Sequence, residues 1–244
     1  MVLLGLALFS TGCSDYGFTH PDDQLFVECF DRFYEAEEVD PDPSCQSFVE
    51  TATLRNVIEW STKDWSDLAP GHKHVASQPI AVPIDDDKFP DIVLISHYQS
   101  KSLIRALSGK DGSPIWSIDD MAFQKNGGLA AGDIDADGRV EILVPTLSNR
   151  VIAFEHDGTL KWQSEHHAGA IPESHAYPAI ANLDGQGLPE IIVGSAILDA
   201  DGNLLGRGEY GRGGGHVGAA SFAADVDQDG NQEVIVGNAI YDMT

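Results

Sequence analysis

Four acidic loops, each running directly into a strand-like run of β-branched residues, constrain the fold of this chain most strongly. We number them loop 1 (residues 83–91), loop 2 (133–141), loop 3 (182–190) and loop 4 (225–233). Loops 2 and 4 carry Asp at positions 1, 3 and 5, Gly at position 6 and Glu at position 9. Oxygen side chains in this pattern suit a hard divalent cation, and the glycine permits a sharp turn around it. The loops therefore predict calcium sites.

The residues immediately after these loops exclude an EF-hand. An EF-hand would need a bidentate Glu at position 12 and a helix on each side. Position 12 is Val144 in loop 2 and Val236 in loop 4, and both lie in strand-like runs. Because Asp and Gly also favour ordinary turns, a metal-free turn is the alternative interpretation for any single loop.

The spacing of the loops predicts an all-β fold. The ninth positions of consecutive loops are 50, 49 and 43 residues apart. An Asp-Gly dipeptide between apolar runs, a strong hairpin signal, recurs in step at 111–112, 157–158 and 201–202. In the second repeat the expected strands are 127–131, 141–147, 150–155 and 160–164. Repeats of this length with four strands each are typical of β-propeller blades. We expect about three blades and part of a fourth.

The repeats resemble the FG-GAP/VCBS repeats of integrin-α-like β-propellers, over roughly residues 53–244. The resemblance implies structural calcium in the loops. Loop 1 departs from the pattern, with Pro83 in place of a ligand and Lys88 in place of the glycine. We therefore expect sites in loops 2 and 4 and a weaker one in loop 3. The implied ligands are Asp133, Asp135, Asp137, the Arg139 carbonyl and Glu141 in loop 2; Asn182, Asp184, Gln186 and Glu190 in loop 3; and Asp225, Asp227, Asp229, the Asn231 carbonyl and Glu233 in loop 4.

The N-terminus predicts export. Residues 1–12 form an apolar run that ends in small residues, too short to span a membrane. Small residues directly before Cys13 resemble a bacterial lipobox, although Ser10 stands where Leu is usual and no basic residue precedes the run. We expect Cys13 to carry a lipid anchor at the cell envelope or surface. Plain secretion is the alternative.

Residues 13–52 are expected to form an acidic spacer. Once Cys13 is assigned to lipidation, Cys29 and Cys45 remain, and an even number of cysteines in an exported chain predicts a disulfide. Closing a loop of this size would stabilise by about 3 kcal/mol. The segment is too polar and proline-rich to build a core.

The net charge of −25 excludes some partners. Nucleic acids and anionic membrane surfaces both require a basic face, so contact with a membrane is expected only through the lipid anchor. The acidity instead fits calcium binding in an extracellular setting.

Few other residues are candidates for catalysis or binding. His74, His175 and His216 are expected near the inner strands, where the alternatives are a channel-mouth site and simple capping. His166 and His167 are expected to be solvated. Trp116 and Trp162, at matching positions after the Asp-Gly turns, are expected to pack between blades. A similar glycine–tryptophan spacing occurs in quinoprotein propellers.

The C-terminal region predicts an incomplete ring. Only residues 234–244 come after loop 4, which suffices for one strand and a turn. The chain therefore resembles a C-terminally truncated propeller, with residues 56–61 as a candidate ring-closing strand.

Taken together, these features predict a calcium-stabilised, surface-anchored propeller that binds an extracellular protein or polysaccharide. A non-enzyme is favoured because no nucleophile or metalloprotease motif is present. The alternatives are the propeller scaffold of a polysaccharide lyase or hydrolase and, less favoured, a quinoprotein-like redox propeller.

Overall fold

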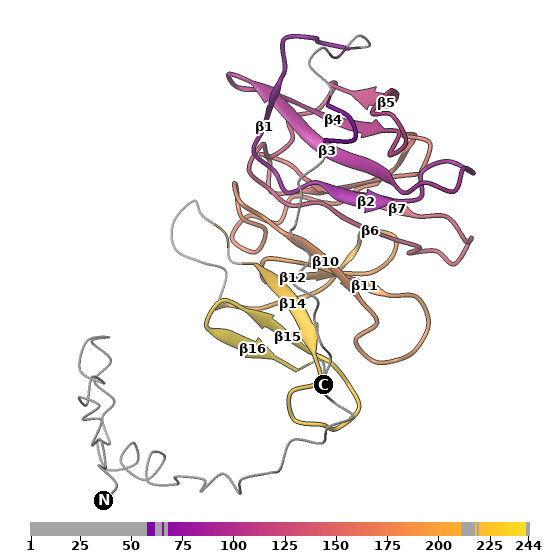
Figure 1. Ribbon diagram of the computed structural model, residues 1–244. Helices are drawn as coiled ribbons and strands as arrows, with labels where there is room; N and C mark the ends of the chain where they lie inside the picture. The colour runs from indigo at the N-terminus through magenta and orange to yellow at the C-terminus, as the bar shows by residue number, and fades with distance from the viewer. Residues whose placement is uncertain (1–57, 62–64, 66–67, 211–217, 219, 243–244) are drawn as a thin grey trace, which may run out of the picture. The chain divides into compact units, whose positions relative to one another are not determined.

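Antiparallel sheets account for all the regular structure in the computed structural model (Figure 1). The structure describes residues 58–61, 65, 68–210, 218 and 220–242. No α-helix occurs in these ranges, so no helix there has the length and apolar character that a bilayer crossing requires. The predictions for the signal, Cys13, Cys29, Cys45 and His216 lie outside the described residues.

The described strands form four sheets, which we call blades 1 to 4 in chain order. Blade 1 contains β1 (His74–Val75), β2 (Ile80–Val82), β3 (Asp91–Tyr98), β4 (Lys101–Leu107) and β5 (Pro114–Ile118). Blade 2 contains β6 (Ala130–Gly132), β7 (Glu141–Pro145), β8 (Val151–Phe154) and β9 (Leu160–Gln163). Blade 3 contains β10 (Pro178–Ala181), β11 (Glu190–Val193), β12 (Ala196–Leu198) and β13 (Leu204–Arg207). Blade 4 contains β14 (Ser221–Ala224), β15 (Glu233–Val236) and β16 (Ala239–Tyr241). The predicted all-β propeller with an incomplete fourth blade is confirmed.

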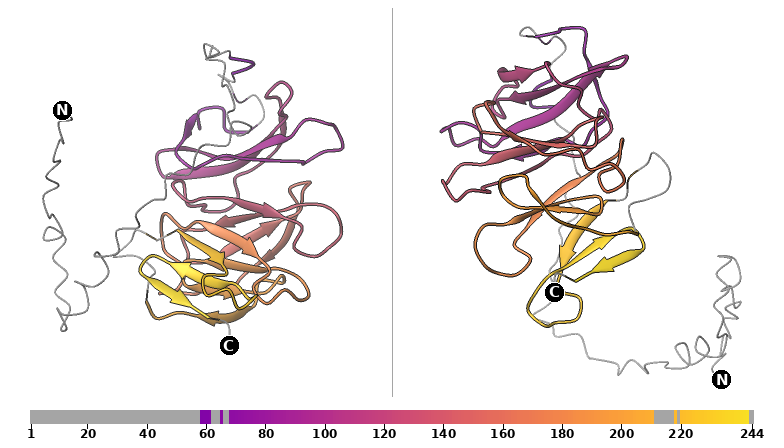
Figure 2. Two further views of the ribbon diagram at one scale, coloured as in Figure 1. Left: turned by 60° about the horizontal axis from the view of Figure 1, so that its bottom comes forward. Right: turned by 180° about the vertical axis from the view of Figure 1, so that it is seen from behind.

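The central strands are largely apolar because both of their faces are buried between blades. Along β7, Ile142 and Val144 join a core shared with blade 1, whereas Leu143 joins a core shared with blade 3. A third core, which includes Ile192 and Val234, lies between blades 3 and 4. Successive side chains of a strand point to opposite faces, so an unbroken Ile/Leu/Val run binds a sheet to both neighbours. Figure 2 shows the blades succeeding one another in chain order.

The inner strand of blade 1 is divided. Both β1 and β2 pair with β3, and the chain leaves the sheet between them. Ser77 fills the interruption, because its Oγ accepts the N–H of Ile95 at 3.1 Å and donates to the Ile95 carbonyl at 3.3 Å. The side chain thus supplies the hydrogen bonds that a continuous strand would have supplied.

Tryptophans join each blade to the next, as expected for Trp116 and Trp162. The indole Nε1 of Trp116 donates to the His156 carbonyl at 2.9 Å, and that of Trp162 donates to the Ala200 carbonyl at 2.8 Å. Each ring lies against the glycine of the next blade's Asp-Gly turn, Gly158 or Gly202. Only a residue without a Cβ leaves room for the ring there.

Residues 58–61 are not in any strand, so the prediction of a ring-closing strand at 56–61 is wrong for its described part. Trp60 instead repeats the inter-blade contact: its Nε1 donates to the Gly109 carbonyl at 2.9 Å, and its ring lies against Gly112. Trp60 thus serves a turn contact rather than a sheet, and its neighbour Ile58 is exposed.

We expect Gly202→Ala to destabilise the protein more than Gly138→Ala. Both glycines have a left-handed φ, +80° and +88°, so both substitutions cost about 1 kcal/mol in backbone strain. A Cβ at position 202 would also lie 2.6 Å from the Trp162 ring, whereas position 138 has open space. Gly202→Ala should therefore lower the free energy of unfolding by at least about 1 kcal/mol more than Gly138→Ala does. This corresponds to a further decrease of roughly 2–4 °C in Tm, measured without calcium. Equal losses would contradict the role of the tryptophan contact.

Candidate metal centre

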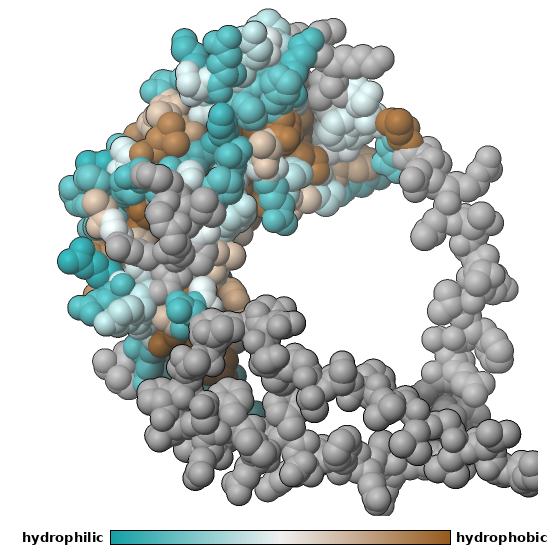
Figure 3. Space-filling view, turned by 90° about the vertical axis from the view of Figure 1, so that its left-hand side faces the viewer, coloured by the Kyte–Doolittle hydropathy of each residue, from teal (hydrophilic) through white to brown (hydrophobic). Residues whose placement is uncertain are grey.

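The four acidic loops occupy the same place in every blade. Each connects the inner strand to the next strand of its sheet: β2 to β3, β6 to β7, β10 to β11 and β14 to β15. The ninth position of each loop is the first residue of that second strand: Asp91, Glu141, Glu190 or Glu233. Figure 3 shows one side of the molecule, where hydrophilic residues surround scattered apolar patches on the described surface. The repeat therefore brings all four acidic loops to one edge of the stacked sheets.

A shared hydrogen bond anchors each loop to its strand. The carboxylate at position 9 accepts the backbone N–H of position 2, at 2.7–3.0 Å in the four loops. This carboxylate is almost fully buried in loops 1, 2 and 4. The side chain at position 3 accepts the N–H of position 5 in all four loops. The side-chain oxygens are thereby ordered around the loop's interior.

The backbone separates loop 1 from the others. Loops 2, 3 and 4 have left-handed residues at positions 4 and 6; position 4 is Ala136, Gly185 or Gln228, with φ of 64–68°. In loop 1, neither Asp86 nor Lys88 has a positive φ. Because a left-handed residue at these positions turns the chain sharply, loops 2 to 4 share a curvature that loop 1 lacks.

Carboxylates gather closely enough in three loops to hold a metal ion. Four groups each place one oxygen per residue within 4.8 Å of the others. The groups are Asp133, Asp135 and Glu141; Asp137, Glu141 and Glu155; Asp225, Asp227 and Asp229; and Asp85, Asp87 and Asp91. Loop 3 is not among them because it offers neutral Asn182 and Gln186 at positions 1 and 5. The structure thus brings together the carboxylates expected in loop 2 and the three aspartates expected in loop 4, without Glu233, and additionally the three acids of loop 1.

Unpartnered oxygens separate loops 2 and 3 from loop 1. Among the described residues, Glu141 Oε1 and Asn182 Oδ1 are buried without a hydrogen-bond partner. Both are predicted ligands. In loop 1, by contrast, Asp91 Oδ2 accepts two backbone N–H groups and Asp91 Oδ1 accepts the N–H of Gly109 at 3.2 Å. Buried polar atoms are normally satisfied, so loops 2 and 3 fit an added cation, whereas loop 1 is satisfied by the protein itself.

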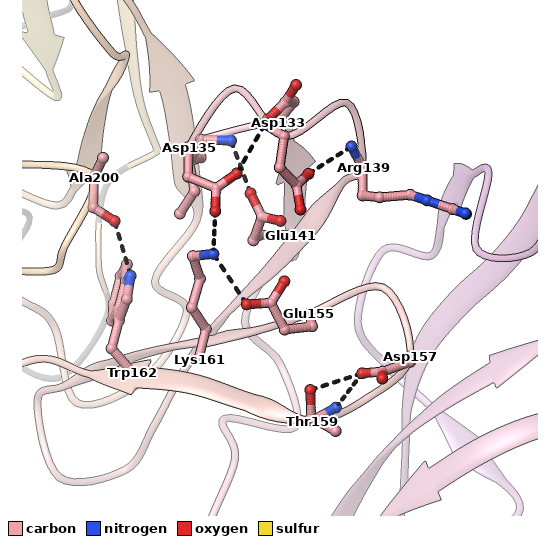
Figure 4. Close-up of polar contacts among 12 residues, drawn as sticks. Asp133, Asp135, Arg139, Glu141, Glu155, Asp157, Thr159, Lys161, Trp162 and Ala200 are labelled. Carbon is pink, nitrogen blue, oxygen red and sulfur yellow. Dashed lines mark hydrogen bonds and ion pairs between the residues drawn. The ribbon is translucent and has the colours of Figure 1, made fainter.

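Electrostatics in loop 2 also favours a cation. Burial raises the pKa of Glu141 to about 7. Burial lowers the pKa of Lys161, but hydrogen bonds to Asp135 and Glu155 outweigh this and hold it above its ordinary value. The bond from Lys161 lowers the pKa of Asp135. Figure 4 shows the lysine reaching between Asp135 and Glu155, with Glu141 beside them. Glu155 was not predicted, because its proximity depends on the β8–β9 turn lying next to loop 2.

The histidines do not assemble a catalytic group within the described residues. His74 is exposed in β1 and its ring lies 5.6 Å from that of His97. His175 lies in a connection, with Nδ1 3.0 Å from Ser174 Oγ. His166 is exposed as expected, but the expectation for His167 is wrong: it is 9% exposed. Its carbonyl accepts backbone N–H groups from a tight turn that packs under blade 3, and burial lowers its pKa.

Comparison with known proteins supports the fold. No family model and no curated protein sequence matches this chain. The V. cholerae biofilm matrix protein Bap1 aligns at 25% identity and TM-score 0.63, over 76% of this chain and 32% of Bap1. The chain thus spans about a third of that protein. Rhamnogalacturonan lyase YesW aligns at 23% identity and TM-score 0.44, over 63% of this chain and 27% of the lyase. BamB from Moraxella catarrhalis aligns at 13% identity and TM-score 0.44, over 72% and 46% of the two chains. These neighbours are β-propeller-like proteins.

Glu141→Gln should stabilise the calcium-free protein at pH 8 and lose this advantage by pH 5. The folded-state pKa, about 7, lies above the ordinary value of 4.5, so the folded state takes up a proton more readily than the unfolded state. The wild type is therefore penalised above pH 7 and relieved as the pH falls toward 4.5. We expect a difference on the order of 1–3 kcal/mol at pH 8, from urea unfolding in a chelator. Glu165→Gln, an exposed change of the same charge, is the control. An equal effect of both variants would contradict this assignment.

Proposed function

We propose that this chain is a calcium-stabilised β-propeller that acts as a binding or adhesion module for an extracellular polysaccharide or protein. The observation that carries the calcium assignment is Glu141 Oε1, a fully buried oxygen without a partner among the described residues, in a carboxylate that lies with those of Asp133 and Asp135 within 4.8 Å. Calcium prefers six to eight such oxygen ligands.

The structural role proposed for calcium rests on repulsion among the carboxylates. Two carboxylates 4 Å apart repel by about 1 kcal/mol in water and about 4 kcal/mol at intermediate dielectric. In loop 4, Asp225, Asp227 and Asp229 bring oxygens within 4.8 Å of one another, and Glu233 is buried behind them. A divalent ion removes this repulsion. It also fixes the loop to the first residue of the buried central strand, so that each blade edge becomes rigid.

The binding role rests on the likeness to Bap1, whose described function is that of a biofilm matrix protein. At 25% identity and TM-score 0.63, this likeness favours an extracellular or envelope protein. The predicted signal and the lipid on Cys13 would hold the propeller at the cell surface. Because the chain carries a net charge of −25, an anionic ligand would need calcium between the two surfaces.

Calcium should raise the melting temperature and bind at two or three sites. Saturation at about 100 times the dissociation constant stabilises by about 2.7 kcal/mol per site, provided the unfolded chain does not bind. Asp133→Asn and Asp225→Asn should each remove one ion, counted by calorimetric titration and metal analysis on the same sample. Asp111→Asn, outside the loops, should change neither quantity. Wild-type protein that binds no calcium, with a Tm unaffected by chelator, would refute the assignment.

The binding role is tested on immobilised biofilm-matrix polysaccharides and matrix proteins, with calcium or with chelator. We expect retention that is saturable and at least tenfold weaker in chelator. Release of shortened or unsaturated oligosaccharides would instead identify an enzyme. Absence of retention on every matrix polymer would contradict a binding module.

A further inference from the structure

Loop 2 contains a second group of carboxylates that the repeat pattern does not explain. Asp137, Glu141 and Glu155 bring one oxygen each within 4.8 Å of one another, and Glu141 also belongs to the group formed with Asp133 and Asp135. Glu155 lies outside the loop, directly after β8, at the start of the turn that leads to β9. Separations below 4.8 Å between ligand oxygens are those allowed by calcium–oxygen distances of about 2.4 Å.

The residue shared by both groups has a free, buried oxygen. Glu141 is 0% exposed, and its Oε2 accepts the backbone N–H of Ile134 at 2.8 Å. Its Oε1 has no hydrogen-bond partner among the described residues. A buried carboxylate oxygen beside another carboxylate, that of Glu155, is unfavourable unless a cation lies between them.

Lys161 supplies part of that positive charge. Its ammonium lies 2.6 Å from Asp135 Oδ2 and 3.0 Å from Glu155 Oε1, and its side chain is only 16% exposed (Figure 4). It does not contact Glu141 Oε1. The lysine therefore holds Glu155 facing the loop but leaves the buried oxygen unsatisfied.

This arrangement is specific to blade 2. The residue in the place of Glu155, directly after the strand that leads into the Asp-Gly turn, is Ser108 in blade 1 and Asp199 in blade 3, and Gly109 follows Ser108. Gly109 donates its N–H to Asp91 Oδ1 at 3.2 Å, so blade 1 satisfies the corresponding oxygen with the backbone. The Asp199 carboxylate is turned to its own turn, where it accepts from Asp201 and Asn203. Of these three blades, only blade 2 places a carboxylate from this position of the turn, that of Glu155, next to the carboxylate at the ninth loop position.

We propose that Glu155 is a further ligand of the calcium ion held by loop 2. Together with Asp133, Asp135, Asp137, the Arg139 carbonyl and Glu141, it brings the ligand set to six oxygens, the lower end of calcium's preference. This inference rests on the proposed function, because it assigns a ligand to the same site.

The test measures calcium affinity by titration calorimetry on the full chain. Asp184→Asn and Asp227→Asn form the background, which disables loops 3 and 4 and leaves one ion to bind. In this background Glu155→Gln should weaken calcium binding at least tenfold. Asp157→Asn is the matched control, because Asp157 lies in the same turn and its carboxylate accepts hydrogen bonds from Thr159 within the described part of the chain. It should stay within threefold of the background.

A second variant separates coordination from remote charge. Glu155→Asp keeps the charge but withdraws the carboxylate by one methylene, and it should also weaken binding at least tenfold. Circular dichroism and calcium-free melting establish that each variant folds. If Glu155→Asp retains the background affinity, or Glu155→Gln matches Asp157→Asn, the inference is overturned while the proposed function stands. If the background protein binds no calcium, the proposed site in loop 2 fails as well.

Discussion

The carboxylate at the ninth position of each acidic loop, buried in blades 1, 2 and 4, connects the fold of this protein to its candidate metal centre. Through one oxygen it accepts the N–H of position 2, which ties the acidic loop to the sheet. Whether its second oxygen has a hydrogen-bond partner determines whether the loop needs a cation. In blade 1 the backbone satisfies it, whereas in blade 2 Glu141 Oε1 has no partner among the described residues. The acidic loops thus differ in their need for a cation, although each lies at the same place in its blade.

The blades supply the rigidity on which this arrangement depends. Each central strand is buried on both faces, and each Asp-Gly turn receives a tryptophan from the preceding part of the chain. These contacts lie on hairpins neighbouring the acidic loops: Glu155 and Lys161 flank the turn against which Trp116 packs. Packing between blades therefore also positions the charges around loop 2.

Much of the fold could be predicted because its signals are local. Asp-Gly dipeptides mark the hairpins, and β-branched runs mark strands such as β7 and β11. Contacts that cross between elements could not be predicted. The pattern of loop 1 does not reveal that Gly109 satisfies Asp91, nor does the pattern around residue 155 reveal that Glu155 faces loop 2. The apolar run around Trp60 predicts a strand, because such a run does not show what it packs against.

The sequence by itself determined the blade repeat, the acidic loops and the tryptophan spacing, because each depends on residues close together in the chain. The tertiary structure alone decided which carboxylate oxygens are satisfied, since their partners come from other hairpins. Asp91 accepts the backbone N–H of Gly109, whereas Glu141 lies near the carboxylate of Glu155, which pairs with Lys161. A buried oxygen's need for a cation is set by its surroundings in space, and spacing along the chain cannot specify them.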